Sequence, residues 1–283
     1  MSTVPPVLHR LFDDAAMFPP GNAPMARAVP AHLSYRSTAF ADLVGPFVLP
    51  AGRLAELPEL LGALDGVIEL AVTLSDGPAP VSEVACAVGR MPGAVLRALE
   101  VVVPEAMRID TLLGHLSEVD DSTDVYVEAP RAERRSAVIA ALTGTRYRVK
   151  FRTGGARASA HPEGPELAAA ICAAANAGVP FKATAGLHHA VRNTDTATGF
   201  EQHGFLNVLV ATDAAVRGAE ISEVARILER RDGERLAAAV RGLGTGVRRR
   251  FVSFGTCSVL EPLGDLRALG LVSATVHIGE GVK

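Results

Sequence analysis

Residues 147–155 read YRVKFRTGG, and residues 180–189 read PFKATAGLHH after a spacer of about one helix length. Each segment has an apolar residue before a lysine and a glycine four residues after it, which pairs Lys150 with Gly154 and Lys182 with Gly186. Both segments are typical of short strands that end in a glycine turn, and the alanine-rich stretch 163–177 between them is predicted to be helical. This order predicts two parallel strands joined by a right-handed helical crossover.

Lysine is rare in this chain. Only three of its 28 lysine and arginine residues are lysines, namely Lys150, Lys182 and Lys283. A guanidinium stays protonated, whereas a lysine amine can lose its proton when it is desolvated and then act as a nucleophile or base. We therefore expect at least one of the two internal lysines to be functional. The alternative is that both extend toward solvent or pair with carboxylates.

The alternation of strand and helix continues on both sides of these segments. Further strands are predicted at 46–50, 67–75, 95–104, 124–130 and 248–258, each tied to a helical stretch. Along 67–75, Glu69 and Thr73 fall on one face and Leu70 and Val72 on the other. Strands with one polar and one apolar side fit a closed barrel with a polar lumen. Because no phosphate-binding glycine motif follows a strand, we expect a TIM-like (β/α) barrel over residues 46–283.

Residues 203–218 read HGFLNVLVATDAAVRG and fit two structures. The apolar run, broken only by Asn207, suits a buried strand, but Phe205, Val208 and Leu209 also fall at helical spacing. If the segment is a strand, the barrel has eight strands. If it is a helix, the barrel has seven or closes irregularly.

Residues 1–45 are predicted to form an N-terminal arm and a helix that pack on the barrel. Five prolines in the first 24 residues leave little room for regular hydrogen bonding, so this part is expected to be extended. We expect the arm to cover apolar surface while its two acids, Asp13 and Asp14, are solvated. The alternative is that one of them is donated to a site in the barrel.

The composition excludes several classes of protein. A net charge of -3 gives no electrostatic footprint for nucleic acid or an anionic membrane, and no apolar run approaches the length of a membrane span. Three widely spaced cysteines do not suggest a disulfide framework, and the N-terminus lacks the apolar core of a signal peptide. These features predict a cytoplasmic protein and leave a homo-oligomer open.

The lysine segments form the first candidate site. Lys150 is predicted to point into the lumen near the top of its strand, with Lys182 at a similar height on the next strand. Two ammonium groups close together would each lower the pKa of the other. Arg152 and the backbone N–H groups of Thr153 and Gly154 suit a carboxylate or phosphate. The other side chains expected to contact a substrate are those of Glu69, Thr184, Asn207 and Cys257.

Histidines and a second lumen acid form the next candidate group. Adjacent residues on an extended chain point in opposite directions, so only one of His188 and His189 is expected to face a site. His188 or Glu128 is predicted to move protons beside the lysines, although Glu128 fits a plain ion pair equally well. The absence of HxH or HExxH spacing predicts no metal or other cofactor, with a divalent metal as the alternative. Partners of a histidine in that metal site would come from His203, Glu69, Glu128 and Cys257.

VKFRTGG and FKATAGL resemble the two lysine-bearing strands of class I (Schiff-base) aldolases of the deoxyribose-phosphate aldolase type. By that resemblance, Lys150 matches the lysine that forms the imine and Lys182 matches the second lysine that perturbs it. The chain departs from the family at Arg152, where the family has a small residue, and at LHHAVR after the second strand. With its FPP, HGFLN and FGTCS blocks, the whole chain also resembles an uncharacterised bacterial family.

These features together predict an enzyme acting on a small carbonyl or carboxylate compound. The leading hypothesis is a lyase that makes or breaks a carbon–carbon bond through a lysine imine. The second is an isomerase, epimerase or dehydratase that uses lysine or metal-assisted proton transfer. The third is a barrel that binds a small molecule without catalysis.

Overall fold

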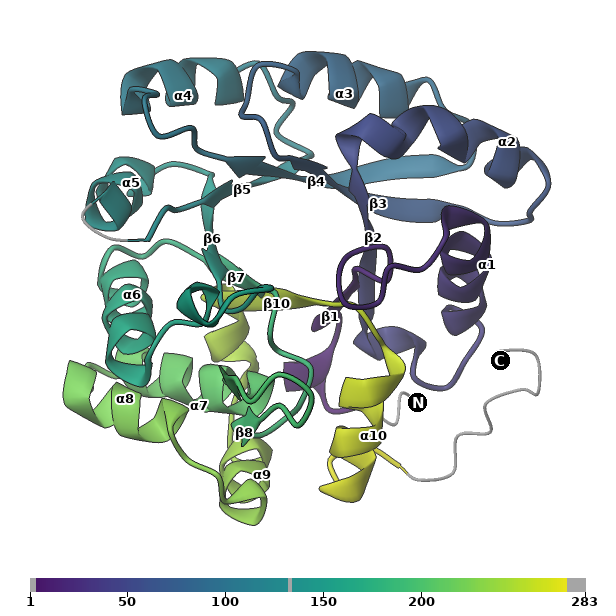
Figure 1. Cartoon of the computed structure of the whole chain (residues 1–283). Coiled ribbons are helices and arrows are strands. Elements are labelled where there is room, and N and C mark those ends of the chain that lie inside the picture. Colours follow the sequence, from purple (N-terminus) through teal and green to yellow (C-terminus); the bar gives the residue numbers. More distant parts are fainter. Residues whose placement is uncertain (1–3, 132–133, 274–283) are drawn as a thin grey trace.

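The protein is built on a closed barrel of eight parallel strands (Figure 1), as seen in a computed structural model that describes residues 4–131 and 134–273. The predicted TIM-like architecture is therefore confirmed. Around the barrel the strand order is β1-β10-β7-β6-β5-β4-β3-β2. The barrel strands are β1 (Phe12–Asp14), β2 (Val44–Pro50), β3 (Ile68–Leu74), β4 (Ala94–Val102), β5 (Asp124–Glu128), β6 (Arg148–Arg152), β7 (Phe181–Thr184) and β10 (Phe251–Thr256).

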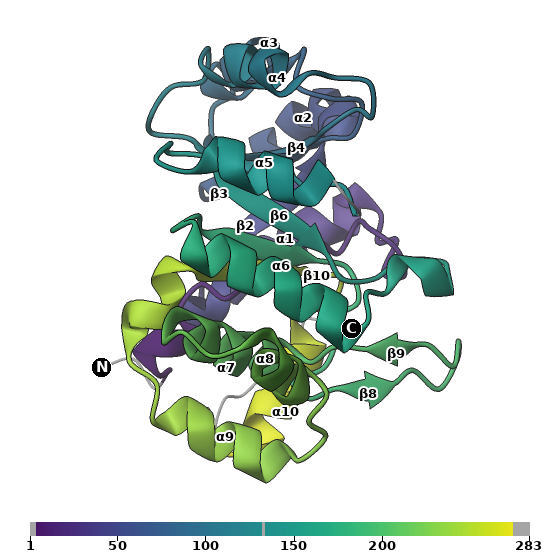
Figure 2. The ribbon, with the colours of Figure 1, turned by 90° about the vertical axis from the view of Figure 1, so that its left-hand side faces the viewer.

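Helices surround the barrel, and a small hairpin of β8 (Asn193–Thr194) and β9 (Glu201–Gln202) extends beside it (Figure 2). In the described ranges, no helix combines the length and apolar character needed to cross a bilayer. The α-helices are α1 (Met25–Tyr35), α2 (Leu57–Gly62), α3 (Val81–Gly89), α4 (Ile109–Leu116), α5 (Arg134–Leu142), α6 (Gly164–Asn176), α7 (Phe205–Val216), α8 (Ile221–Leu228), α9 (Gly233–Arg241) and α10 (Leu260–Ala268). Short 3₁₀ helices are η1 (Pro6–Leu8), η2 (Ala41–Leu43), η3 (Ala51–Glu56), η4 (Ala158–Ala160) and η5 (Thr245–Arg249).

The N-terminal segment differs from the prediction of an arm outside the barrel. Strand β1 pairs in parallel with β10, where Asp13 is the register partner of Gly255, and with β2, where Phe12 is the partner of Val44. Strand β1 therefore closes the barrel between β10 and β2. A boundary at residue 46 does not separate an arm from the barrel, because residues 12–14 are part of the wall.

The segment 203–218 forms helix α7, so its interpretation as a strand is wrong. The barrel nevertheless has eight strands, because β1 supplies the one that this helix does not. Helix α7 is buried on almost every side, which explains its apolar run: a helix surrounded by protein lacks a polar face. Two further helices, α8 and α9, follow α7 along the chain. Asp232 accepts a hydrogen bond from the backbone N–H of Arg235 and caps the second one.

The alternation along the strands matches the predicted lumen. On β3, Leu70 and Val72 belong to the apolar layer between the barrel and the helices, while Ala71 packs in a separate lumen cluster with Tyr126 of β5. The lumen cluster is small, and charged side chains occupy the remaining space. One side of each strand thus stabilises the fold, and the other is left for polar groups.

The turns that follow β6 and β7 are locked together. The backbone N–H of Thr153 donates to Thr184 O at 2.9 Å, and its hydroxyl donates to Ala185 O. A Cβ on Gly154 would lie 2.7 Å from Gly186 Cα, and one on Gly186 would lie 2.8 Å from Thr153 O. Gly186 also has a φ of 73°, in the left-handed region. These glycines are required for the close approach of the two loops.

We expect Gly186→Ala to unfold at a clearly lower urea concentration than Gly144→Ala. The two positions share nearly the same φ, 73° and 72°, but Gly144 has no atom within 4 Å of an added Cβ. The control variant Gly144→Ala should therefore lose only about 1 kcal/mol of unfolding free energy, from the strain of a left-handed backbone. Gly186→Ala should lose about 2 kcal/mol more, because its new Cβ would overpack against backbone atoms. Equal midpoints for the two variants would contradict the locked loops.

Candidate functional site

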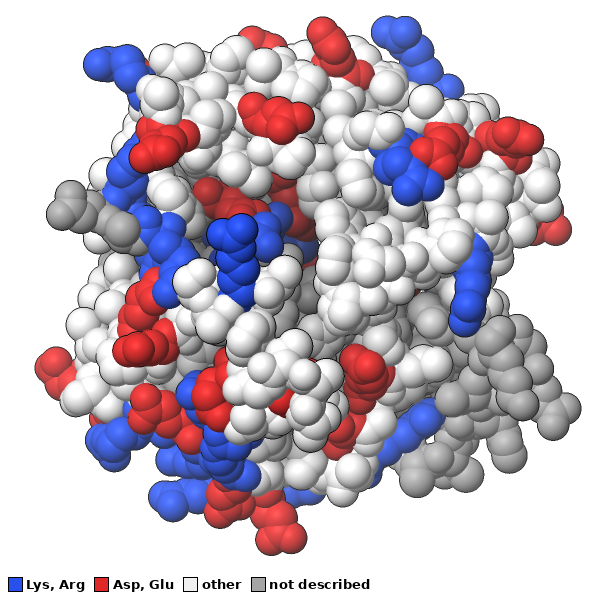
Figure 3. Space-filling model, in the orientation of Figure 1, with Lys and Arg blue, Asp and Glu red and all other residues white. Residues whose placement is uncertain are grey.

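A hollow of about 280 Å³ opens at the carboxyl ends of the strands, where such barrels place their active sites. Acidic and basic side chains gather in a depression near the centre of this face (Figure 3). Residues at or just after the ends of β5, β6, β7 and β10 line the hollow, together with Phe18 and Pro19 from the loop after β1. Its polar lining includes Thr73, Glu100, Glu128, Lys150, Arg152, Lys182, Thr184, His188 and Cys257.

The two internal lysines are neighbours in the lumen, as the sequence predicts. Lys150 of β6 and Lys182 of β7 are register partners, and only 4% and 1% of their surfaces are exposed. Both line the hollow. A buried ammonium needs a compensating charge, so the partners of these side chains decide what they can do.

Glu100 of β4 bridges the two lysines. Its Oε2 lies 2.8 Å from Lys150 Nζ, and its Oε1 accepts a hydrogen bond from Lys182 Nζ. Burial alone would raise the pKa of Glu100, but Lys150 and then Lys182 outweigh it and lower the pKa to about 2. Sequence reasoning missed this residue. The available signal was one acid inside the apolar run 95–104, on the same strand face as Ala98 and Val102.

Lys182 has a second carboxylate partner in Asp13 of β1, which also accepts a hydrogen bond from Ser253 Oγ at 2.7 Å. The aromatic ring of Tyr126 lies 5.2 Å from Lys182 Nζ. Burial lowers the pKa of Lys182, but Asp13 and Glu100 outweigh burial and hold it above the ordinary value. The expectation that neighbouring ammonium groups would lower this pKa is therefore wrong, because carboxylates lie between them.

Lys150 has its second partner in Glu128, whose Oε2 lies 2.8 Å from Lys150 Nζ. The other oxygen of Glu128 accepts a hydrogen bond from Arg152 Nε at 2.9 Å, and 44% of the Arg152 side chain is exposed. Burial raises the pKa of Glu128, but Lys150 and Arg152 outweigh it and hold the pKa below the usual range. Three basic and three acidic side chains, counting Asp13 and Glu100, thus lie together beneath the hollow. Burial raises the pKa of Asp13, although the contact with Lys182 opposes this.

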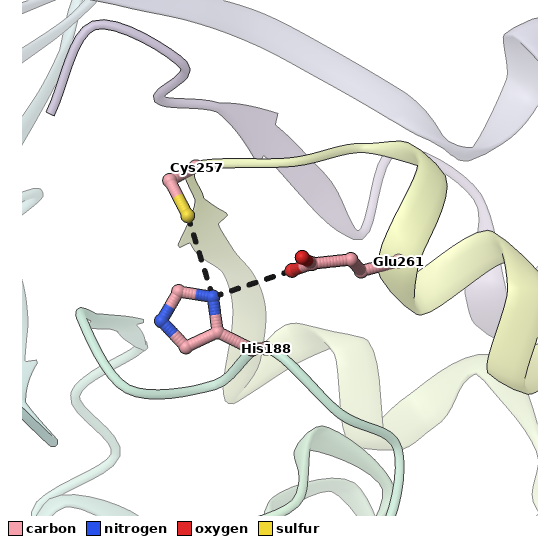
Figure 4. Close-up of side chains that lie close together, drawn as sticks. All are labelled: His188, Cys257 and Glu261. Carbon is pink, nitrogen blue, oxygen red and sulfur yellow. Dashed lines mark hydrogen bonds and ion pairs between the residues drawn. The ribbon is translucent and has the colours of Figure 1, made fainter. Parts of the chain in front are cut away.

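A second group of side chains lies at the rim. His188 Nδ1 is 3.3 Å from Cys257 Sγ and 3.6 Å from Glu261 Oε2, and the three side chains point toward one another (Figure 4). Hydrogen bonding to Cys257, and then to Glu261, raises the pKa of His188 to about 10. The sequence predicted His188 and Cys257 in the site but not Glu261, which stands in the first turn of α10.

Several residues predicted to contact a substrate lie elsewhere. Glu69 faces the lumen at the opposite end, where it pairs with Arg10, Arg36 and Arg97. Asn207 is fully buried on α7; its Oδ1 accepts from the backbone of residue 192, and its Nδ2 donates to carbonyls of residues 227 and 230. Neither residue lines the hollow.

Thr153 and Gly154 do not line the hollow either, because they form the contact between the β6 and β7 turns described above. Gly155, the next residue, does line it. The other two histidines that the sequence analysis considered for the site have partners elsewhere. His203 Nε2 lies 2.8 Å from Pro162 O, and His189 Nδ1 lies 3.1 Å from Asp265 Oδ2.

Comparison with known proteins does not place the chain in a family. Neither a protein-family model nor a curated protein matches this chain. The interpretation of the site therefore depends on its own chemistry.

We expect Glu100→Gln to destabilise the protein at neutral pH by on the order of 3 kcal/mol, since it removes the shared partner of two buried ammonium groups. A carboxylate whose pKa falls from 4.5 to about 2 on folding stabilises the native state above about pH 4.5, and this stabilisation is lost as the pH falls toward 2. Between pH 5 and pH 2, the free energy of unfolding measured in urea should therefore fall less steeply with pH for the variant than for the parent. The two slopes should differ by up to about 1.4 kcal/mol per pH unit.

Glu59→Gln is the matched control, because Glu59 is exposed on α2. It should unfold like the parent at every pH. A Glu100→Gln variant with the same acid dependence as the parent would show that Glu100 does not carry the charge assigned to it.

Proposed function

We propose that this protein is a lyase-type enzyme that forms an imine between Lys150 and a small carbonyl compound. The observation that carries the proposal is the position of Lys150 Nζ, buried on the wall of the hollow and 2.8 Å from each of two carboxylates, Glu100 and Glu128. A lysine can attack a carbonyl only after it gives up a proton. Here an acceptor for that proton is already in contact with the amine.

Glu128 is the better acceptor of the two. Glu100 remains paired with Lys182, so its charge stays stabilised when Lys150 becomes neutral. Glu128 is held ionised by Lys150 and Arg152, and Arg152 is partly exposed. A substrate carboxylate or phosphate that paired with Arg152 would withdraw this partner. The pKa of Glu128 would then rise, which favours proton transfer from Lys150.

The neutral amine then adds to the carbonyl carbon, and protonated Glu128 returns its proton to the carbinolamine hydroxyl, which leaves as water and gives a protonated imine. The bond between the α and β carbons of the substrate then breaks: the β-hydroxyl gives its proton to Glu128 and becomes the carbonyl of the first product, while the iminium nitrogen accepts the electron pair, which leaves an enamine. Glu128 returns this proton to the enamine carbon, and hydrolysis of the imine releases the second product and restores Lys150. Glu100 and Glu128 already surround a cation at this nitrogen, so the iminium enters a site that is preorganised for its charge.

The size and lining of the hollow support a small polar substrate. Its volume of about 280 Å³ lies just below the usual range for ligand sites, which starts at about 300 Å³. Thr184 provides a hydroxyl, and Phe18 and Val102 provide apolar wall. In this proposal, Lys182 is a permanent cation that keeps Glu100 charged, rather than a group that activates Lys150 by repulsion.

Reductive trapping tests the imine. The folded protein, treated with acetaldehyde or pyruvate and cyanoborohydride, should gain the mass of the carbonyl compound less one oxygen atom. Peptide mapping should place this adduct on Lys150, and the Lys150→Arg variant should lack it. In urea, Lys150 should no longer be modified in preference to the other amines of the protein, because its reactivity comes from the folded site. If neither probe modifies Lys150 in the folded protein, the imine is excluded, and proton transfer or simple binding would be the remaining hypotheses.

Arg152→Gln should discriminate between the two probes. Loss of a charge-assisted contact to a carboxylate costs about 1.5 kcal/mol or more, so pyruvate trapping on Lys150 should fall by at least about tenfold. Acetaldehyde lacks a carboxylate, and its trapping should not fall, because the substitution only removes a partner of Glu128. An equal loss with both probes would show that Arg152 supports the site and does not bind the substrate anion.

A further inference from the structure

We propose that His188, Cys257 and Glu261 form a binding site for one divalent transition-metal ion, with zinc as the best fit. The three ligand atoms all lie within 4.8 Å of one another. Two ligands of a tetrahedral zinc ion at the usual Zn–N, Zn–S and Zn–O distances lie about 3.3 to 3.6 Å apart. The separations seen here are 3.3 Å between nitrogen and sulfur and 3.6 Å between nitrogen and oxygen.

The way the three side chains point distinguishes a metal site from a catalytic triad. In a triad, a histidine uses one ring nitrogen for the nucleophile and the other for the acid that orients it. Here Cys257 Sγ and Glu261 Oε2 approach the same nitrogen, Nδ1 of His188 (Figure 4). One proton cannot be shared well by three such atoms, whereas a cation placed among them would contact each one.

The backbone holds the ligands in place from two segments, the loop after β7 and the short stretch that runs from β10 into the first turn of α10. His188 follows the β7 turn, in which Ala185 and Gly186 have positive φ values, and Cys257 directly follows β10, the neighbour of β7 in the barrel. Ser258 fixes the start of α10, since its hydroxyl accepts from the backbone N–H of Glu261 at 3.3 Å. Ligands brought together by the barrel itself need little rearrangement to bind an ion.

The donor set favours a borderline-soft ion. Thiolate, imidazole and carboxylate together suit zinc, while magnesium and calcium take oxygen ligands. Three protein ligands also leave a fourth position for water or a substrate oxygen, as in catalytic zinc sites. Cys257 and His188 line the hollow that holds Lys150, and His188 and Glu261 line a second hollow of about 420 Å³ beside it. A metal here would therefore be accessible from both.

The three metal ligands make none of the lysine contacts on which the imine proposal rests, so a metal could bind whether or not Lys150 forms an imine. A metal-bound water or substrate oxygen at the rim would be compatible with lysine chemistry below it, but also with the isomerase and dehydratase alternatives. Binding can be tested without any assay of activity.

The test is metal binding by the chelator-treated, full-length protein. Titration with zinc should give one ion per chain, and cobalt should give the near-ultraviolet band of a thiolate ligand together with the visible spectrum of a tetrahedral site. Cys257→Ser should abolish the thiolate band and weaken zinc binding by more than the roughly 10- to 100-fold that outer-shell partners contribute. Cys86→Ser is the control, since Cys86 is an exposed free cysteine on α3, and it should bind like the parent.

Alkylation of the parent protein gives a second measurement that does not depend on how a variant folds. Zinc should protect Cys257 from iodoacetamide while Cys86 reacts at an unchanged rate. No stoichiometric zinc, a cobalt spectrum without the thiolate band, or equal alkylation of Cys257 with and without zinc would each overturn the proposed site.

Discussion

The carboxylate of Glu100, placed between two buried ammonium groups, is the interaction on which the interior of this barrel depends. Transfer of a single ammonium from water into a protein interior costs several kcal/mol unless a counter-charge accompanies it. Glu100 compensates Lys150 and Lys182 at once, and Asp13 and Glu128 complete the balance on either side. Because every member of this network has a charged partner, the buried charges of the lumen compensate one another.

Barrel closure and the charge network are consequences of the same short strand. Strand β1 contributes only Phe12–Asp14, yet it joins β10 to β2 and brings Asp13 to Lys182. Phe12 packs outward against Phe205 of α7 and Phe254 of β10, which ties the strand to the helical layer. The N-terminal segment therefore acts on stability and on the site together, and a change in β1 should affect both.

Side-chain alternation in the sequence was enough to predict the barrel and the shared face of Lys150, Lys182 and Glu128, because strand period depends only on local geometry. The face of a side chain does not give its height in the barrel. Glu69 has the predicted face but is the second residue of β3, so it lies at the amino end of the barrel, away from the hollow. Strand β1 escaped prediction because three residues between proline-rich stretches carry almost no periodic signal. Asn207 was wrongly predicted to contact the substrate, because the continuous apolar sequence of a fully buried helix resembles that of a buried strand.

The charge state of Lys182 tests the central claim most directly, and a chain with three lysines suits the measurement. Protein labelled with ¹⁵N on lysine gives few side-chain signals, and loss of one in Lys182→Arg assigns it. The network predicts that the Lys182 signal is an ammonium protected from exchange and that it stays protonated as the pH rises past 10.5, the ordinary lysine pKa. A Lys182 amine that titrates at or below that value would contradict the ion-paired lumen and the division of roles between the two lysines.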